Sequence, residues 1–227
     1  MGYGTRLERA IAELDRCEDI KVERQPADPD LTPERLALLA DADLALDRIA
    51  VHWRTRLEDV LRPYYFAADE YHADWITADG RVRGEFCLGN IHGCLVDGHL
   101  PLTDEGLGPD ERRVLPELRI FDQAPFGGAG QVTGLRVLPR GGGVEIWYYV
   151  LTRTELHRLN LDYGTYLEAL LITKGAWGWQ YLFADVDLTE RRYHDAASNL
   201  AAMFEALPVL FPDHDYEPLR ARWRERL

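Results

Sequence analysis

Serine and lysine are nearly absent from this chain of 227 residues. Ser198 is the only serine, and the sequence around it, HDAASNLAAM, predicts a helix and lacks the strand-to-helix turn that holds a serine nucleophile. Lys21 and Lys174 are the only lysines, and the 26 basic residues face 39 acidic ones, a net charge of −13. A protein of this charge repels phosphate backbones and attracts basic surfaces. The composition argues against a serine hydrolase and against nucleic-acid binding, and it favours a basic protein as partner.

Cysteines and long apolar runs are also scarce. Cys17, Cys87 and Cys94 are too few and too scattered for a disulfide framework, which favours a reducing compartment. The chain has no apolar run near the roughly 20 residues of a membrane span, and its first residues lack the apolar core of a signal peptide. We therefore expect a cytoplasmic protein that does not enter a membrane.

Metal and nucleotide motifs are incomplete. The stretch CLGNIHGCLVDGH holds Cys87, His92, Cys94 and His99, but their spacing matches no paired zinc motif. The glycine-rich run at residues 127–130 lacks the lysine of a phosphate loop and precedes a strand-like segment, so it predicts a hairpin connection. We expect neither a metal nor a cofactor.

The first third of the chain has helical patterns. Apolar residues at Leu7, Ile11 and Leu14 indicate an amphipathic helix, and the sequence Thr32-Pro33-Glu34 is typical of a helix start. The apolar arc that follows would include Asp43, which would be costly to bury unpaired. We expect the helix to break at the ADAD stretch, with Asp43 as the cap of a second helix.

The middle of the chain has strand patterns. The runs YHADWIT and RVRGEFCL predict a hairpin that turns at Asp79-Gly80. We expect further strands at residues 91–96, 118–121, 132–138 and 144–151, and then helices at residues 163–173 and 189–207. This order predicts one α+β domain over residues 1–227, with a mostly antiparallel twisted sheet flanked by N-terminal and C-terminal helices. Its parts are helices over 1–62, the sheet and a packing helix over 63–183, and helices over 184–227.

The aromatic residues concentrate in the stretch KGAWGWQYLF. We expect Gly175 to end a helix and the residues from Trp177 to Phe183 to form a strand, with Trp177, Trp179, Tyr181 and Phe183 on one side. Such a segment favours a packed core over an aromatic ligand site. Trp179 should then be buried.

Residues 121–183 resemble bacterial members of the SUKH superfamily. The similar pieces are the run EIWYYV, which ends a strand, the run LNLDYGTYLEAL, which enters a helix, and Gly175 with Gly178-Trp179 after that helix. The resemblance implies a single α+β domain with a central twisted sheet and no catalytic residues. It also implies a protein that works by binding, as do the immunity proteins that neutralise polymorphic toxins.

These observations together predict a non-enzymatic module whose partner is a basic toxin domain. Aromatic side chains anchor interfaces, and carboxylates steer a basic partner. The candidate contact residues are Glu70, Tyr71, Asp74, Trp75, Phe121, Asp122 and Phe126.

Three alternatives remain open at this stage. The same fold could serve as a regulatory scaffold, or the chain could be a small enzyme that uses Asp69, Glu70 and His72. Trp75 and Phe121 could also be core residues, in which case the neighbouring acids would only be hydrated.

Overall fold

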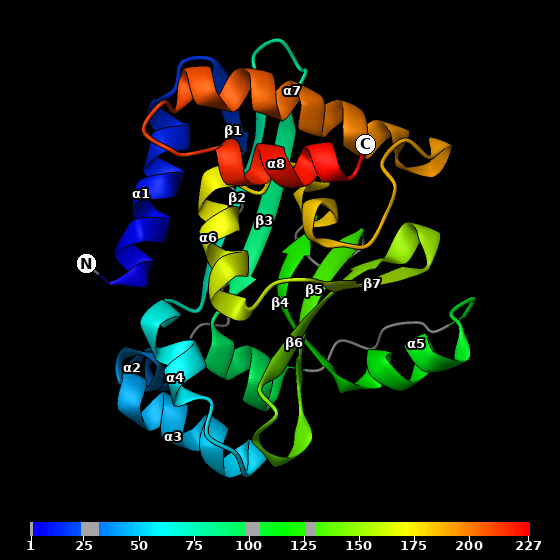
Figure 1. Ribbon diagram of the computed structural model, residues 1–227. Helices are drawn as coiled ribbons and strands as arrows, with labels where there is room; N and C mark the ends of the chain where they lie inside the picture. Colours follow the sequence, from blue (N-terminus) through cyan, green and yellow to red (C-terminus); the bar gives the residue numbers. More distant parts are fainter. Residues whose placement is uncertain (1, 24–31, 99–104, 126–129) are drawn as a thin grey trace.

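A seven-stranded antiparallel sheet runs through the molecule, and each strand pairs with the next one along the chain (Figure 1). The computed structural model describes residues 2–23, 32–98, 105–125 and 130–227. Helices precede and follow the sheet, which confirms the predicted α+β class. The strands are β1 (Ile20–Glu23), β2 (Glu70–Thr77), β3 (Arg83–Gly89), β4 (Leu118–Ala124), β5 (Gln131–Val137), β6 (Val144–Val150) and β7 (Glu155–Leu159).

Among the residues that the structure describes, one α-helix precedes the first strand, three lie between β1 and β2, one lies between β3 and β4, and three follow β7. The α-helices are α1 (Tyr3–Arg16), α2 (Pro33–Ala40), α3 (Ala42–Trp53), α4 (Glu58–Leu61), α5 (Pro109–Val114), α6 (Tyr163–Thr173), α7 (His194–Leu210) and α8 (Glu217–Glu225). The shorter turns are η1 (Arg62–Tyr64), η2 (Gly93–Asp97), η3 (Leu115–Glu117), η4 (Pro139–Gly141), η5 (Leu151–Arg153), η6 (Trp179–Phe183) and η7 (Arg191–Tyr193). Within the described residues, no helix is both long and apolar enough to cross a bilayer.

The β2–β3 hairpin follows from its turn. Gly80 has φ +72°, a conformation that glycine adopts without strain, and the flanking residues pair as Trp75 with Gly84 and Asp74 with Glu85. Side chains along β2 therefore alternate between the two faces of the sheet. Trp75 points to the face covered by α6, which we call the core face, and Asp74 points to the opposite, outer face.

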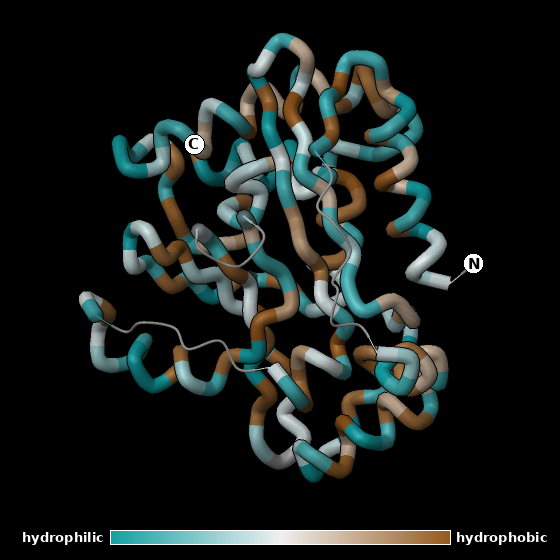
Figure 2. The backbone as a smooth tube through the Cα atoms, turned by 180° about the vertical axis from the view of Figure 1, so that it is seen from behind, coloured by the Kyte–Doolittle hydropathy of each residue, from teal (hydrophilic) through white to brown (hydrophobic). Residues whose placement is uncertain are grey.

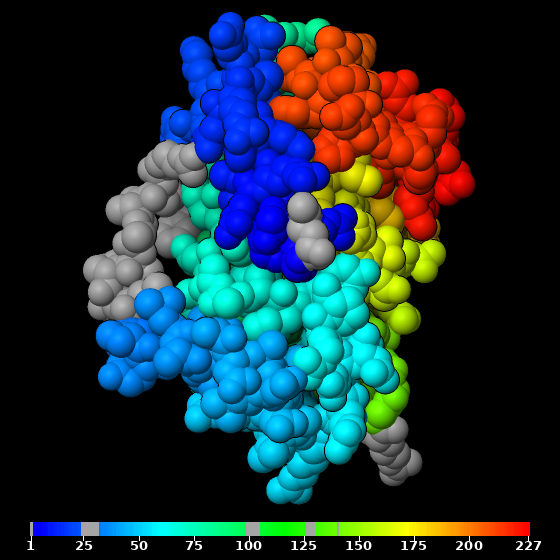
Figure 3. All heavy atoms as spheres, turned by 90° about the vertical axis from the view of Figure 1, so that its left-hand side faces the viewer, coloured from blue at the N-terminus to red at the C-terminus, as the bar shows by residue number. Residues whose placement is uncertain are grey.

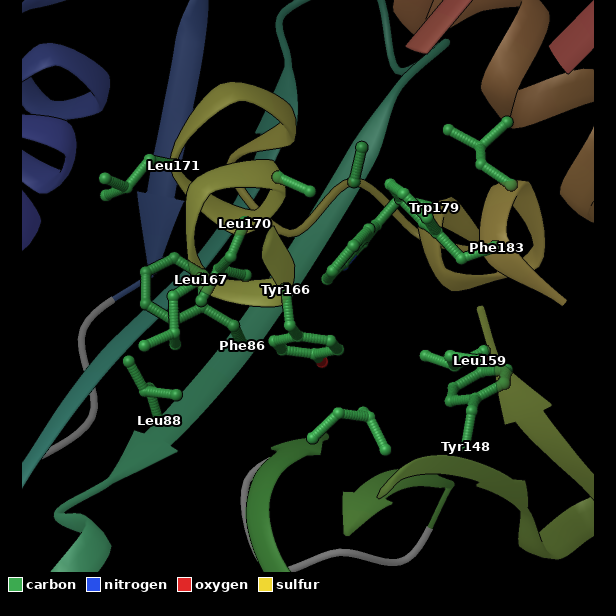
Figure 4. Packing of buried hydrophobic residues seen from close by; sticks show 14 of the residues in the cluster. Phe86, Leu88, Tyr148, Leu159, Tyr166, Leu167, Leu170, Leu171, Trp179 and Phe183 are labelled. Carbon is green, nitrogen blue, oxygen red and sulfur yellow. The ribbon is translucent and has the colours of Figure 1, made fainter. Parts of the chain in front are cut away.

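The main core lies between the core face and the helices α1, α6, α7 and α8 (Figures 1 and 4). Figure 4 shows Leu167 and Leu170 of α6 beside Phe86 and Leu88 of β3. A second, smaller apolar cluster covers the outer face of β4–β7, where residues such as Val132, Tyr149 and Leu156 pack with α5. The outer face of this half of the sheet thus carries an apolar cluster, beside the ion pairs of Glu145 with Arg136 and Arg158.

The first and last helices are joined by a buried lysine. The Lys174 side chain is 0% exposed, and its Nζ binds the carboxylate of Glu13 on α1. His214, between α7 and α8, lies 3.1 Å from the same carboxylate. These contacts fit Figure 3, in which α1 lies beside the C-terminal helices.

The aromatic stretch forms part of the core, but the predicted strand is wrong. Gly175 and Gly178 have positive φ values (+71° and +84°), and η6 follows them as a 3₁₀ helix. Its five residues are all buried, whereas a half-buried strand would alternate. Trp179 is 1% exposed and lies between the rings of Tyr166 and Phe183, at 4.6 and 6.0 Å (Figure 4). The expected burial of Trp179 is therefore confirmed.

Local capping explains two other differences. The predicted strand at residues 91–96 is a helical turn that runs into η2, because Asn90 accepts hydrogen bonds from the amides of His92 (2.9 Å) and Cys94 (3.0 Å). The predicted break after α2 occurs, but Asp41 caps α3 through the amide of Leu44 (3.0 Å). Asp43 lies in the first turn and pairs with Arg62.

The elements β1, β7 and α5 were not predicted from the sequence, and α8 was covered only by the general prediction of helices over residues 184–227. Of these, β1 lies inside the part expected to be only helical, and it pairs with β2 along the edge of the sheet. The last long helix, α7, begins at His194, five residues later than expected.

Candidate functional site

The outer face of β1–β3 is polar and carries a row of acids. Glu23, Asp74 and Glu85 are directly opposite one another on three neighbouring strands, because Asp74 pairs in register with both of the others. We call these three residues the acidic row. Like charges placed directly opposite on a sheet repel each other. Seen from behind, the strands alternate between hydrophilic and hydrophobic residues (Figure 2).

Asp74 is the central member of the acidic row. Partial burial, together with the charges of Glu85 and Glu23, raises its pKa above the usual aspartate value. Within the described parts of the chain, its carboxylate makes no hydrogen bond or ion pair within contact distance. A positive charge brought to this position would therefore be stabilised.

Glu70 and His72 share this outer face. The thiol of Cys87 donates to Glu70 Oε2 at 3.4 Å, and His72 Nε2 lies 3.6 Å from Glu85 Oε1. Burial and the Glu70 charge raise the pKa of the Cys87 thiol far above its usual range. Burial also raises the pKa of Cys94, to about 12. Both thiols stay protonated near neutral pH, which disfavours a thiolate nucleophile.

The structure does not bring together Asp69, Glu70 and His72, the three residues of the enzyme alternative. Glu70 and His72 are neighbours on the outer face, but the carboxylate of Asp69 binds Nε of Arg35, on α2, at 2.6 Å. The described residues also hold no group of three metal-binding side chains, and His99 lies outside them.

Only some of the predicted partner-contact residues lie on the outer face of β1–β3. Glu70 and Asp74 are half-buried on the outer face, whereas Tyr71 points to the other side and donates to Glu8 on α1. Trp75 is 1% exposed and donates from Nε1 to the carbonyl of Lys174 at 2.7 Å. The segment is therefore a strand with acids on one face and aromatics on the other, so the expected contact role of Trp75 is corrected to a core role. Phe126 lies outside the described residues.

Phe121 and Asp122 are also core residues. A β-bulge between Ile120 and Asp122 lets both side chains turn to the core face. Phe121 is 1% exposed and packs edge-on against the rings of Tyr163 and Tyr166. Their predicted place at an interface is therefore corrected.

Asp122 is fixed by hydrogen bonds. Its Oδ2 accepts from the hydroxyl of Tyr166 at 2.6 Å, and its Oδ1 accepts from the amide of Cys87 at 3.1 Å. Burial raises its pKa to about 6 despite these bonds. Asp122 is thus a buried acid that titrates well above the usual range.

A cavity of about 540 Å³ opens beside the acidic row, where β3 and β4 diverge. The ladder between these strands holds only the pairs Cys87–Gln123 and Leu88–Asp122. Towards its first residue, β3 is joined instead by the chain after α6, with Glu85 N bound to Gly175 O (3.0 Å) and Trp177 N to Arg83 O (2.9 Å). The walls of the cavity include Asp74, Arg83, Glu85, Gln131, Arg153 and Trp177.

Sequence reasoning missed several residues of the acidic row and of the cavity, namely Glu23, Arg83, Glu85, Gln131, Arg153 and Trp177. The position of Glu85 could have been found, because a hairpin centred on Asp79-Gly80 places it opposite Asp74. Glu23 joins the row through the pairing of β1 with β2, and the cavity residues come together only through the divergence of β3 and β4. No local pattern in the sequence marks that divergence.

Comparisons with known proteins add no relative. No protein-family model matches the chain, and neither a curated protein nor a solved structure is significantly similar to it.

Proposed function

We propose that this protein is a non-enzymatic binding module that neutralises a basic toxin domain by direct contact through the outer face of β1–β3. The acidic row is the observation that carries the proposal. Three carboxylates in register form a feature that costs stability in the free protein, because like charges directly opposite on a sheet are destabilising. A cationic partner would relieve that repulsion.

The overall charge supports the same function. With a net charge of −13, the chain attracts a basic domain over distances that exceed direct contact. Nucleases and other toxins that hold an acidic substrate need a basic surface, which an acidic inhibitor can cover without any chemistry. The resemblance to SUKH immunity proteins points in the same direction.

The alternatives differ in what they require of this face. A regulatory scaffold would use the same acids for a host protein in place of a toxin. An enzyme built on Asp69, Glu70 and His72 has less support, because Arg35 holds Asp69 away from the other two. The protonated thiols of Cys87 and Cys94 give no support to a cysteine nucleophile either.

The test is association with any basic toxin domain that a gene beside this protein's gene encodes. The double variant Glu70→Lys with Asp74→Lys should slow association by about tenfold at low salt and much less at high salt, because salt screens the steering charge. The control is Asp47→Lys with Asp59→Lys, which changes the net charge equally on α3 and α4. Failure of every neighbouring secreted toxin domain to form a complex, together with no protection of cells, would overturn the proposal.

A further inference from the structure

The cavity beside the acidic row has an unbalanced charge. Three carboxylates line it, from Asp74, Glu85 and Asp195, against the two guanidinium groups of Arg83 and Arg153. Arg153 is already engaged, since it donates to the carbonyl of Arg192 and to the hydroxyl of Tyr181, and its Nε lies 3.5 Å from Glu155. Glu85 is engaged as well, by His72 at 3.6 Å. The carboxylates of Asp74 and Asp195 then face the single guanidinium of Arg83, so the charge left at the cavity is negative.

Two polar groups of the walls, the carboxylate of Asp74 and the amide of Gln131, are open to a ligand. Asp74 has no direct hydrogen bond or ion pair among the described residues, as noted above. On the opposite wall Gln131 is 8% exposed, and its Oε1 accepts from the hydroxyl of Tyr148. Within the described chain no acceptor binds its Nε2. A carboxylate on one wall and the amide of Gln131 on the other are suited to a ligand that carries both a cation and a carbonyl.

An arginine within a polypeptide has that combination. Its guanidinium is planar, stays charged and offers five donors, which suits a site with several carboxylates better than the compact charge of lysine does. The aromatic wall is also compatible with a guanidinium, since Arg83 already stacks over the Trp177 ring at 5.1 Å.

We propose that the cavity receives one arginine side chain of the basic partner, with the guanidinium at Asp74 and Glu85 and a neighbouring backbone carbonyl at Gln131 Nε2. This inference rests on the proposed function and deepens it, because it assigns an anchoring residue to a partner that the acidic row attracts. Anchors of this kind fill pockets near the centre of an interface, and arginine is enriched among them.

The test uses Nα-acetyl-arginine amide as the probe, titrated into the purified protein by calorimetry. Nα-acetyl-citrulline amide is the matched control ligand, because it keeps the shape and removes the charge. We expect saturable binding of the arginine compound and at least about tenfold weaker binding of citrulline. The variant Asp74→Asn should weaken arginine binding by about tenfold as well.

A control variant separates the cavity from the acidic row. Glu23→Gln removes a charge of the row outside the cavity, so it should leave binding of the probe nearly unchanged. Equal binding of both ligands, no saturable binding, or an Asp74→Asn protein that binds like the wild type would overturn the inference.

A different result distinguishes failure of the arginine anchor from failure of the proposed function. A toxin domain that binds wild type and Asp74→Asn equally, yet loses affinity with Glu70→Lys, would retain the binding function and remove the arginine anchor.

Discussion

The two halves of the sheet differ in what covers their outer face. In β4–β7 apolar clusters pack on both faces, and charged residues of the outer face are paired, as Glu145 is with Arg136 and Arg158. In β1–β3 only the core face is apolar, and the outer face carries Glu23, Asp74 and Glu85. A strand buried on both faces has no room for uncompensated charge. The comparison therefore favours the outer face of β1–β3, which stability leaves polar, as the place for the proposed binding function.

The contrast between a packed core and a polar binding face would be wrong if the aromatic stretch after α6 served binding instead of packing. Replacing Trp179 by alanine should lower the free energy of unfolding by about 3–5 kcal/mol, because a large buried ring leaves a cavity. Chemical denaturation of both proteins measures this difference. Trp177→Ala is the control, since this half-buried residue lies at the wall of the cavity and should cost much less. Equal losses for the two variants would contradict the division between core and binding face.

Asp122 allows a pH test of the core face. A carboxyl whose pKa is higher in the folded state favours folding below the unfolded pKa, and this stability is lost as pH rises through the folded value. With a folded pKa of about 6, the loss should be about 3 kcal/mol between roughly pH 4 and pH 7, at about 1.4 kcal/mol per pKa unit. The measurement is the free energy of unfolding of wild type and Asp122→Asn across this range.

The control for that experiment is Asp59→Asn, which removes an exposed acid on α4. The difference between wild type and Asp122→Asn should change with pH, while the difference between wild type and Asp59→Asn should stay nearly constant. Parallel curves for wild type and Asp122→Asn would mean that Asp122 titrates normally.

Local signals account for what the sequence predicts correctly. Asp79-Gly80 sets the hairpin, Thr32-Pro33-Glu34 starts α2, and the run of leucines in α6 predicts a helix whose residues pack on the sheet. These features depend on residues close in the chain, so turn and capping chemistry is sufficient.

The remaining features depend on contacts between distant residues. The bulge at Phe121 turns two successive side chains to the same face, which a period of two does not predict. The positive φ values of Gly175 and Gly178 convert an apparent strand into η6. The cavity arises because the chain after α6 replaces β4 as the neighbour of β3, a choice made by tertiary packing alone.

A third test concerns how tightly β2 and β3 pack on the core face. A methyl group at Gly84 would lie 2.6 Å from the ring of Trp75, which is held in place by its bond to the carbonyl of Lys174. Gly84→Ala should therefore lower stability by about 1–3 kcal/mol, as overpacking usually does. Thermal unfolding checks this loss against Gly2→Ala, where the added methyl meets no atom within 4 Å. A neutral Gly84→Ala would show that Trp75 moves freely, against its assignment to the core.

The smallest effect is expected on the outer face, and its sign is opposite. Asp74→Asn should raise the free energy of unfolding by about 0.2–1 kcal/mol, because it relieves repulsion from the directly opposed Glu85 and Glu23. The gain should shrink in high salt, since these side chains are partly exposed and salt screens their charges. Asp69→Asn, at the residue directly before β2, is the matched control and should give no gain, because it weakens the ion pair with Arg35. If Asp74→Asn instead destabilises the protein while Asp69→Asn stabilises it, the acidic row is not a strained binding surface, and the contrast between the two halves of the sheet loses its functional meaning.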